Sequence, residues 1–88
     1  MRYKPNGWFL IAGRVLLLRR QGRLSFATIR DGSDAIQLFV SEAELGADRH
    51  AAFDGLDLGD WVGIDGTVMT TRKGELSVKV REFVLLAK

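Results

Sequence analysis

Aromatic, amide and guanidinium side chains alternate with small and apolar residues in segment 22–40, "GRLSFATIRDGSDAIQLFV". The segment reads as two strands joined by a tight Gly-Ser turn, and successive side chains of a strand point to opposite faces. Phe26 and Arg30 share the face opposite the small and apolar residues of the first strand, and Gln37 and Phe39 do so in the second. An exposed ring can stack on a nucleobase, and a glutamine amide can donate to and accept from a base edge.

Basic residues flank this hairpin in two expected loops. Arg19, Arg20 and Arg23 bracket the loop before it, and Arg72 and Lys73 lie in the loop before the last strand. Cations at the rim of a ring-bearing face would hold a phosphate backbone. The pattern therefore predicts a binding surface for a single-stranded nucleic acid.

The net charge of +2 hides an uneven distribution of charge along the chain. Residues 42–65 hold seven acidic residues and one arginine, whereas the rest of the chain holds twelve basic and four acidic residues. A basic surface attracts polyanions. The alternative is that the two groups of charges mix on the folded surface.

Each candidate side chain also has a plainer interpretation. Phe26 and Phe39 could be covered by a loop or a second subunit, and Gln37 could be an ordinary solvated strand residue. Ordinary surface placement is the favoured interpretation for Lys79 and Arg81, which alternate with the apolar residues of the last strand.

The chain offers little for catalysis or metal binding. It has no cysteine, and its single histidine, His50, is expected on the surface of the acidic segment. Ser25 has no visible base, and the carboxylates Asp54, Asp57 and Asp60 miss the calcium-loop spacing of an EF-hand. We therefore expect no catalytic residues, no metal site and no cofactor within this chain.

Turn signals divide the chain into five strands with one helical connection. Ser41 and Glu44 match a capping box, Gly46 is expected to break the helix, and Asp48 to cap a second turn. A bulge or bend is expected at Gly13, and another irregularity near residues 82–83. Residues 1–7 are expected to form a loose lead-in, and the strands to span residues 8–20, 24–31, 35–40, 61–71 and 76 onward.

This order predicts one all-β domain over residues 1–88, a five-stranded OB-fold (Greek-key) barrel with a helical insert between the third and fourth strands. Closing the sheet into a barrel removes its edges. The OB-fold binds ligands on the face of its second and third strands, which here carry the two phenylalanines. An SH3-like barrel is the less favoured alternative because the helical insert is long.

Two stretches, "AGRVLLLRRQGRLSFATIRDGSDAIQLFVS" and "LDLGDWVGIDGTVMTTRKGELSVKVREFVLLAK", resemble the N-terminal anticodon-binding domain of class II lysyl-tRNA synthetases. The resemblance implies that Phe26 stacks on an anticodon base and that Gln37 reads the central uridine. It also implies a contact from Arg19, with Arg20 as the second choice, and places Glu75 near the anticodon. The partner implied is a tRNA anticodon loop, that of tRNA-Lys.

The catalytic part of such synthetases has no counterpart in these residues. ATP and magnesium would belong to that missing part, and the resemblance implies a fused or associated catalytic domain. The chain is expected to be either an excised domain or a free-standing or differently fused OB module. With no cysteine, no signal-peptide pattern and no apolar run near ~18 residues, a cytoplasmic protein without a membrane span is expected. The alternatives are a general single-stranded nucleic-acid binder and a protein-interaction module.

Overall fold

Five long strands enclose one apolar core, and the side chains along each strand alternate between buried and exposed. The computed structural model describes residues 2–3, 9–32, 34–70 and 76–87. The barrel strands are β2 (Phe9–Gln21), β3 (Leu24–Asp31), β4 (Asp34–Ser41), β5 (Trp61–Thr70) and β6 (Leu76–Ala87). Arg2–Tyr3 forms a short strand, β1, which pairs with β2 where a loose lead-in was expected.

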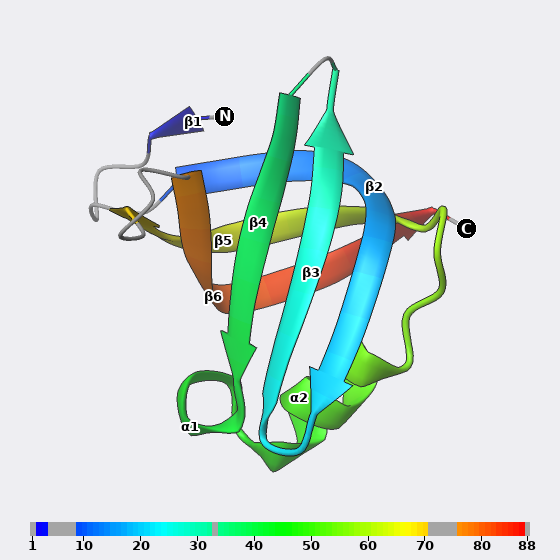
Figure 1. Cartoon of the computed structure of the whole chain (residues 1–88), viewed down its shortest axis with the longest axis vertical. Helices are drawn as coiled ribbons and strands as arrows, with labels where there is room; N and C mark the ends of the chain where they lie inside the picture. The colour runs from blue at the N-terminus through cyan, green and yellow to red at the C-terminus, as the bar shows by residue number, and fades with distance from the viewer. Residues whose placement is uncertain (1, 4–8, 33, 71–75, 88) are drawn as a thin grey trace.

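The sheet closes on itself. Its strand order is β1-β2-β3-β4-β6-β5, and an additional pairing of β2 with β5 completes the barrel (Figure 1). All pairs are antiparallel except β4 with β6. This topology confirms the expected five-stranded OB-fold barrel with a helical segment between its third and fourth strands.

The barrel interior is filled by aliphatic side chains with two phenylalanines at one end. Phe53 and Phe83 contact edge to face, with their ring centroids 5.1 Å apart. The remaining buried core residues are Ile11, Val15, Ala27, Ile29, Ile36, Leu38, Val40, Leu56, Val62, Ile64, Val78 and Val80. The inward face therefore agrees with the parity seen in the sequence.

Strand β2 belongs to both halves of the barrel and bends between them. Its first part pairs with β5 up to Arg14, and its second part pairs with β3 from Arg14 onward. A Cβ on Gly13 would lie 2.7 Å from the carbonyl oxygen of Arg30, so a side chain there would block the close approach of the two strands. The bulge itself lies between Val15 and Leu17, slightly later than expected.

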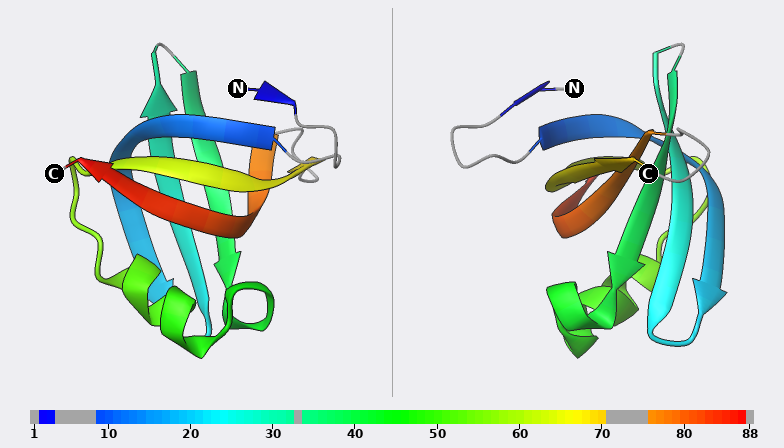
Figure 2. Two further views of the ribbon diagram at one scale, coloured as in Figure 1. Left: turned by 180° about the vertical axis from the view of Figure 1, so that it is seen from behind. Right: turned by 60° about the vertical axis from the view of Figure 1, so that its left-hand side comes forward.

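Two short helices, α1 (Glu42–Leu45) and α2 (Ala47–Asp54), cover one end of the barrel (Figure 2). The side chain of Ser41 accepts a hydrogen bond from the backbone N–H of Glu44, as the capping box predicts. Gly46 separates the helices and occupies the N-cap of α2. The expectation that Asp48 caps this second helix is therefore wrong, and Asp48 lies in its first turn.

Candidate nucleic-acid interface

The strand register places the candidate side chains in two neighbouring rows on the outer face of β3 and β4. One row runs across four strands and contains Arg19, Phe26, Phe39 and Lys79. The adjacent row contains Leu17, Thr28, Gln37 and Ser77. Residues facing each other across antiparallel strands lie about 5 Å apart, so the members of both rows on β2, β3 and β4 form one continuous surface. Ser77 at the β6 end of the second row is buried.

Phe26 and Phe39 form the apolar centre of this surface. Their ring centroids lie 4.9 Å apart at an interplanar angle of 88°, an edge-to-face contact. Both side chains are only partly buried, whereas Ser25, Ala27, Leu38 and Val40 beside them point into the core. The rings therefore lie outside the barrel, as the alternation predicts.

A shallow hollow of about 130 Å³ opens beside Phe26. Phe26, Arg19 and Gln37 line it, whereas Phe39 does not. The hollow thus brings together a ring, a cation and an amide, and Phe39 supports the Phe26 ring from the side. The other four lining residues, Leu17, Ala27, Thr28 and Leu38, were not among the site residues expected from the sequence.

Because of a bulge in β2, the adjacent residues Arg19 and Arg20 point to faces other than those a regular strand would give them. Leu16 is an extra residue in the ladder, because Val15 pairs with Ile29 while Leu17 pairs with Thr28. The extra residue shifts the alternation by one position, so each residue after it points to the opposite face from that expected for a regular strand. Arg19 therefore points toward the rings. Arg20 points to the other side, where its Nε donates to the carbonyl oxygen of Asp54 at 2.7 Å.

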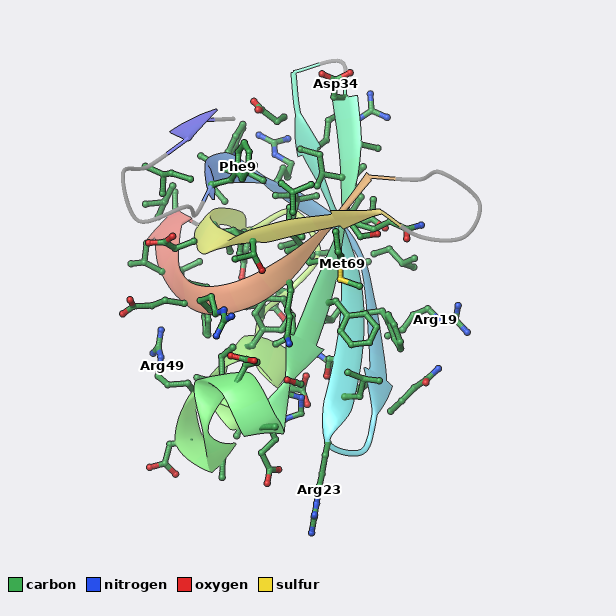
Figure 3. All side chains as sticks on the ribbon, turned by 90° about the vertical axis from the view of Figure 1, so that its left-hand side faces the viewer. Phe9, Arg19, Arg23, Asp34, Arg49 and Met69 are labelled. Carbon is green, nitrogen blue, oxygen red and sulfur yellow. The ribbon has the colours of Figure 1, made fainter. Side chains whose placement is uncertain are left out.

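The other expected cations lie at different distances from the rings. Arg30 is exposed near the far end of the same face and pairs in register with Ala35. Arg23 lies in the turn between β2 and β3, and its side chain points away from the end of the sheet (Figure 3). Three further expected contacts, Arg72, Lys73 and Glu75, lie outside the described residues.

Glu44 of α1 forms ion pairs at the Lys79 end of the row that contains the two rings (the ring row). Its carboxylate lies 3.0 Å from Lys79 Nζ and 2.6 Å from an Arg81 guanidinium nitrogen. The hydrogen bond from Lys79, with the charge of Arg81 beside it, lowers the pKa of Glu44 below its usual value of 4.5. Lys79 and Arg81 are thus ion-paired side chains at the surface, and Arg19 is the exposed cation in the ring row.

The buried Ser25 and His50 and the half-buried Asp54 form a polar cluster beneath this face. The Oγ atom of Ser25 lies 3.1 Å from His50 Nε2 and 2.5 Å from Asp54 Oδ1. The expectations of a surface histidine and of a serine without a base are therefore wrong, because α2 packs against β3. Ser25 is fully buried and points inward, so a substrate cannot reach its hydroxyl group.

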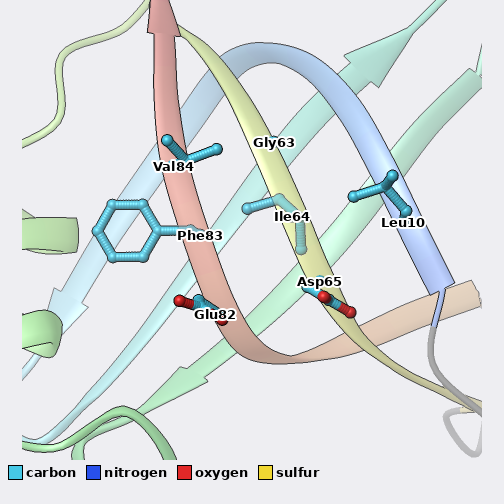
Figure 4. A pocket seen from close by; sticks show the side chains of 7 residues that line it. All are labelled: Leu10, Gly63, Ile64, Asp65, Glu82, Phe83 and Val84. Atoms are coloured by element: carbon cyan, nitrogen blue, oxygen red, sulfur yellow. The ribbon is translucent and has the colours of Figure 1, made fainter. Parts of the chain in front are cut away.

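A larger hollow of about 220 Å³ lies on a different side, over β2, β5 and β6 (Figure 4). Its lining is apolar apart from Asp65 and Glu82. A cavity whose only charged groups are carboxylates repels phosphates, so this hollow does not suit a nucleic-acid backbone. Among the described residues no group of acidic or histidine side chains is arranged to hold a metal ion, and no helix could span a membrane.

A closed five-stranded barrel, a helical segment after its third strand and a polar-aromatic face on the second and third strands define an OB-fold. The particular family follows from comparison with known proteins. Residues 9–86 match the tRNA anti-codon family, described as an OB-fold nucleic acid binding domain, and the chain belongs to this family.

Within this family, the chain is similar in sequence to lysine–tRNA ligases. Over 78 residues the chain is 53% identical to lysine–tRNA ligases of Burkholderia mallei (strain SAVP1) and Burkholderia pseudomallei (strain K96243). The match covers 89% of this chain but only 15% of each ligase, and so leaves most of each ligase unmatched. The crystal structure of asparaginyl-tRNA synthetase from Pyrococcus horikoshii complexed with asparaginyl-adenylate shares the fold, with a TM-score of 0.83 at 24% identity over 96% of this chain and 20% of that one.

Proposed function

We propose that this chain binds the anticodon loop of a tRNA through the outer face of β3 and β4. The observation that carries the proposal is the row of Arg19, Phe26 and Phe39 beside Gln37 on one exposed surface. Stacking a base on a ring stabilises a complex by roughly 1–3 kcal/mol per base, and an arginine beside the ring can contact the phosphate. The same arrangement suits a loop whose bases are unpaired and splayed out.

The base preference we propose is for the uridine-rich anticodon of tRNA-Lys. A uridine edge offers carbonyl acceptors and one N3–H donor, and a glutamine amide complements both. Gln37 is exposed, lines the hollow beside Phe26 and pairs in register with Thr28, whose hydroxyl group is a further donor and acceptor. The similarity to lysine–tRNA ligases supports the same preference.

Anticodon binding by this face requires no cofactor within the chain. We propose that ATP and magnesium act in a synthetase catalytic domain, fused or associated, and that this chain contributes recognition alone. Binding of an isolated stem-loop should therefore need no ATP. The setting proposed is the cytoplasm, where tRNA is aminoacylated.

Three hairpin RNAs that differ only in their anticodon bases test the proposal: a lysine-type UUU loop, a GUU loop and a CCC loop. Fluorescence anisotropy at fixed salt should show several-fold tighter binding of the UUU loop. The variant Gln37→Ala should reduce this preference more than it reduces total affinity, because the ring and the arginine remain. An equal loss for all three loops would contradict the reading role of Gln37.

Two other outcomes would overturn the proposal in different ways. Equal binding of a poly-pyrimidine DNA would identify a general single-stranded nucleic-acid binder that uses the same rings. No binding even at low salt, together with dimers that form as concentration rises, would identify a protein-interaction module instead.

A further inference from the structure

A polar network links α2 to the strands that carry the recognition side chains. Ser25 on β3 donates a hydrogen bond from its Oγ atom to Asp54 Oδ1. Because that hydroxyl proton is used, the oxygen must accept from His50, so Nε2 of the imidazole carries a proton. The chain of hydrogen bonds therefore runs from His50 through Ser25 to Asp54.

A second strand joins the same network. The Nε atom of Arg20 donates to the backbone oxygen of Asp54 at 2.7 Å, and one terminal nitrogen lies 3.4 Å from the backbone oxygen of Leu56. The C-terminal end of α2 is thus held by β2 through Arg20 and by β3 through Ser25. Both contacts lie on the side of the sheet opposite the rings.

The two anchor residues are direct neighbours of two recognition residues. Arg20 pairs in register with Ser25, and the next pair in the ladder is Arg19 with Phe26. Since side chains alternate across a strand, holding one pair from below fixes the backbone that presents the other pair above. Ser25 and His50 are both nearly inaccessible to water, so their hydrogen bonds have no solvent alternative.

We infer that His50, acting through Ser25, is a positioning residue that sets the orientation of the Arg19–Phe26 pair for base stacking. The inference rests on the proposed function, since it concerns the same face. His50 does not touch the RNA. It holds α2 against β3, and a ring on a strand held in place from behind loses less freedom when a base stacks on it.

Paired variants separate positioning from plain stability. His50→Leu keeps a similar volume but removes the donor to Ser25, whereas His50→Gln retains an N–H donor at the corresponding position. We expect His50→Leu to weaken stem-loop binding about three- to tenfold, the equivalent of one lost hydrogen bond. His50→Gln should bind within about twofold of the wild type. Affinities are compared at the folded fraction measured by urea titration.

NMR spectra of the RNA-free protein with labelled aromatic rings provide a second readout. In His50→Leu the ring signals of Phe26 should shift or broaden while those of Trp61, which lies under Arg14 elsewhere on the barrel, stay unchanged. His50→Gln should restore the Phe26 signals. If His50→Leu does not fold, Ser25→Ala removes the same link with a smaller change in volume.

The outcomes distinguish this inference from the proposed function. Failure of the wild type to bind any stem-loop would refute anticodon binding, while the RNA-free spectra would still test the coupling of His50 to Phe26. Wild-type binding with unchanged affinity and unchanged Phe26 signals in His50→Leu would refute the inference alone. Equal effects of the Gln and Leu variants would also refute it, because the donor would then be irrelevant.

Discussion

Removing the Phe26 ring is the most direct test of the proposed interface. A fully buried phenylalanine changed to alanine lowers the free energy of unfolding by about 3–5 kcal/mol. Phe26 is only partly buried, and its edge-to-face contact with Phe39 accounts for about 0.5–1.5 kcal/mol. We therefore expect Phe26→Ala to lower the free energy of unfolding by about 1–2 kcal/mol, which leaves a typical domain folded.

The free energy of RNA binding should change by a similar or larger amount. Loss of one stacked base weakens the complex by roughly 1–3 kcal/mol, which is about a 5- to 150-fold increase in Kd. The assay is anisotropy of a labelled lysine-type stem-loop, with urea unfolding of the same protein samples. The magnitude for folding and the magnitude for binding are thus measured independently.

Phe53→Ala is the matched control, since it removes a ring of the same size from the core. Phe53 is fully buried against Phe83, so its loss should lower the free energy of unfolding by about 3–5 kcal/mol. Because Phe53 lies on α2, whose contact with β3 also supports the ring face, this variant is a control for folding and not for RNA binding. If Phe26→Ala unfolds the protein like Phe53→Ala, or leaves RNA affinity unchanged, the outward placement of Phe26 as a stacking ring is refuted.

Three further predictions concern the salt dependence of RNA binding, the packing of Gly66 and the pH dependence of stability. Changing Arg72 and Lys73 together to alanine should reduce the slope of log K against log salt by about two, and an unchanged slope would place the phosphate path elsewhere. Gly66→Ala should lower the urea midpoint strongly, because a Cβ there would clash with the backbone oxygen of Lys79. The lowered pKa of Glu44 adds stability that is present above its unfolded value of 4.5 and is lost as pH falls through the folded pKa, so the difference in urea midpoint between wild type and Glu44→Gln should shrink on acidification below pH 4.5.

Local signals in the sequence were sufficient to predict the five long strands and the face that carries the rings. The period of two places Phe26, Gln37 and Phe39 outward whichever strands lie alongside, because facing along one regular strand depends only on parity. The hairpin turn and the Ser41 cap are likewise short-range interactions. The order of five strands around a helical connection then leaves few ways to hide the sheet edges, which is why the barrel was predictable.

Pairing between strands distant in the sequence determined the position of the bulge and the directions of Arg19 and Arg20. The bulge at Leu16 lies just after β2 passes from pairing with β5 to pairing with β3, and it turns Arg19 to the ring face and Arg20 to the opposite face. The sequence spacing of these two adjacent arginines carries no such information.

The burial of His50 is also a tertiary result. Its environment is made by Ser25, 25 residues away, and by Asp54 of the same helix. The acidic residues of this segment predict a solvated surface, and only the packing of α2 against β3 shows that His50 is buried. The sequence by itself thus determined which face could recognise a base, since alternation is a local property. Only the tertiary structure showed the bulge that turns Arg19 to that face and the contacts with α2 behind it, since both depend on residues remote in the chain.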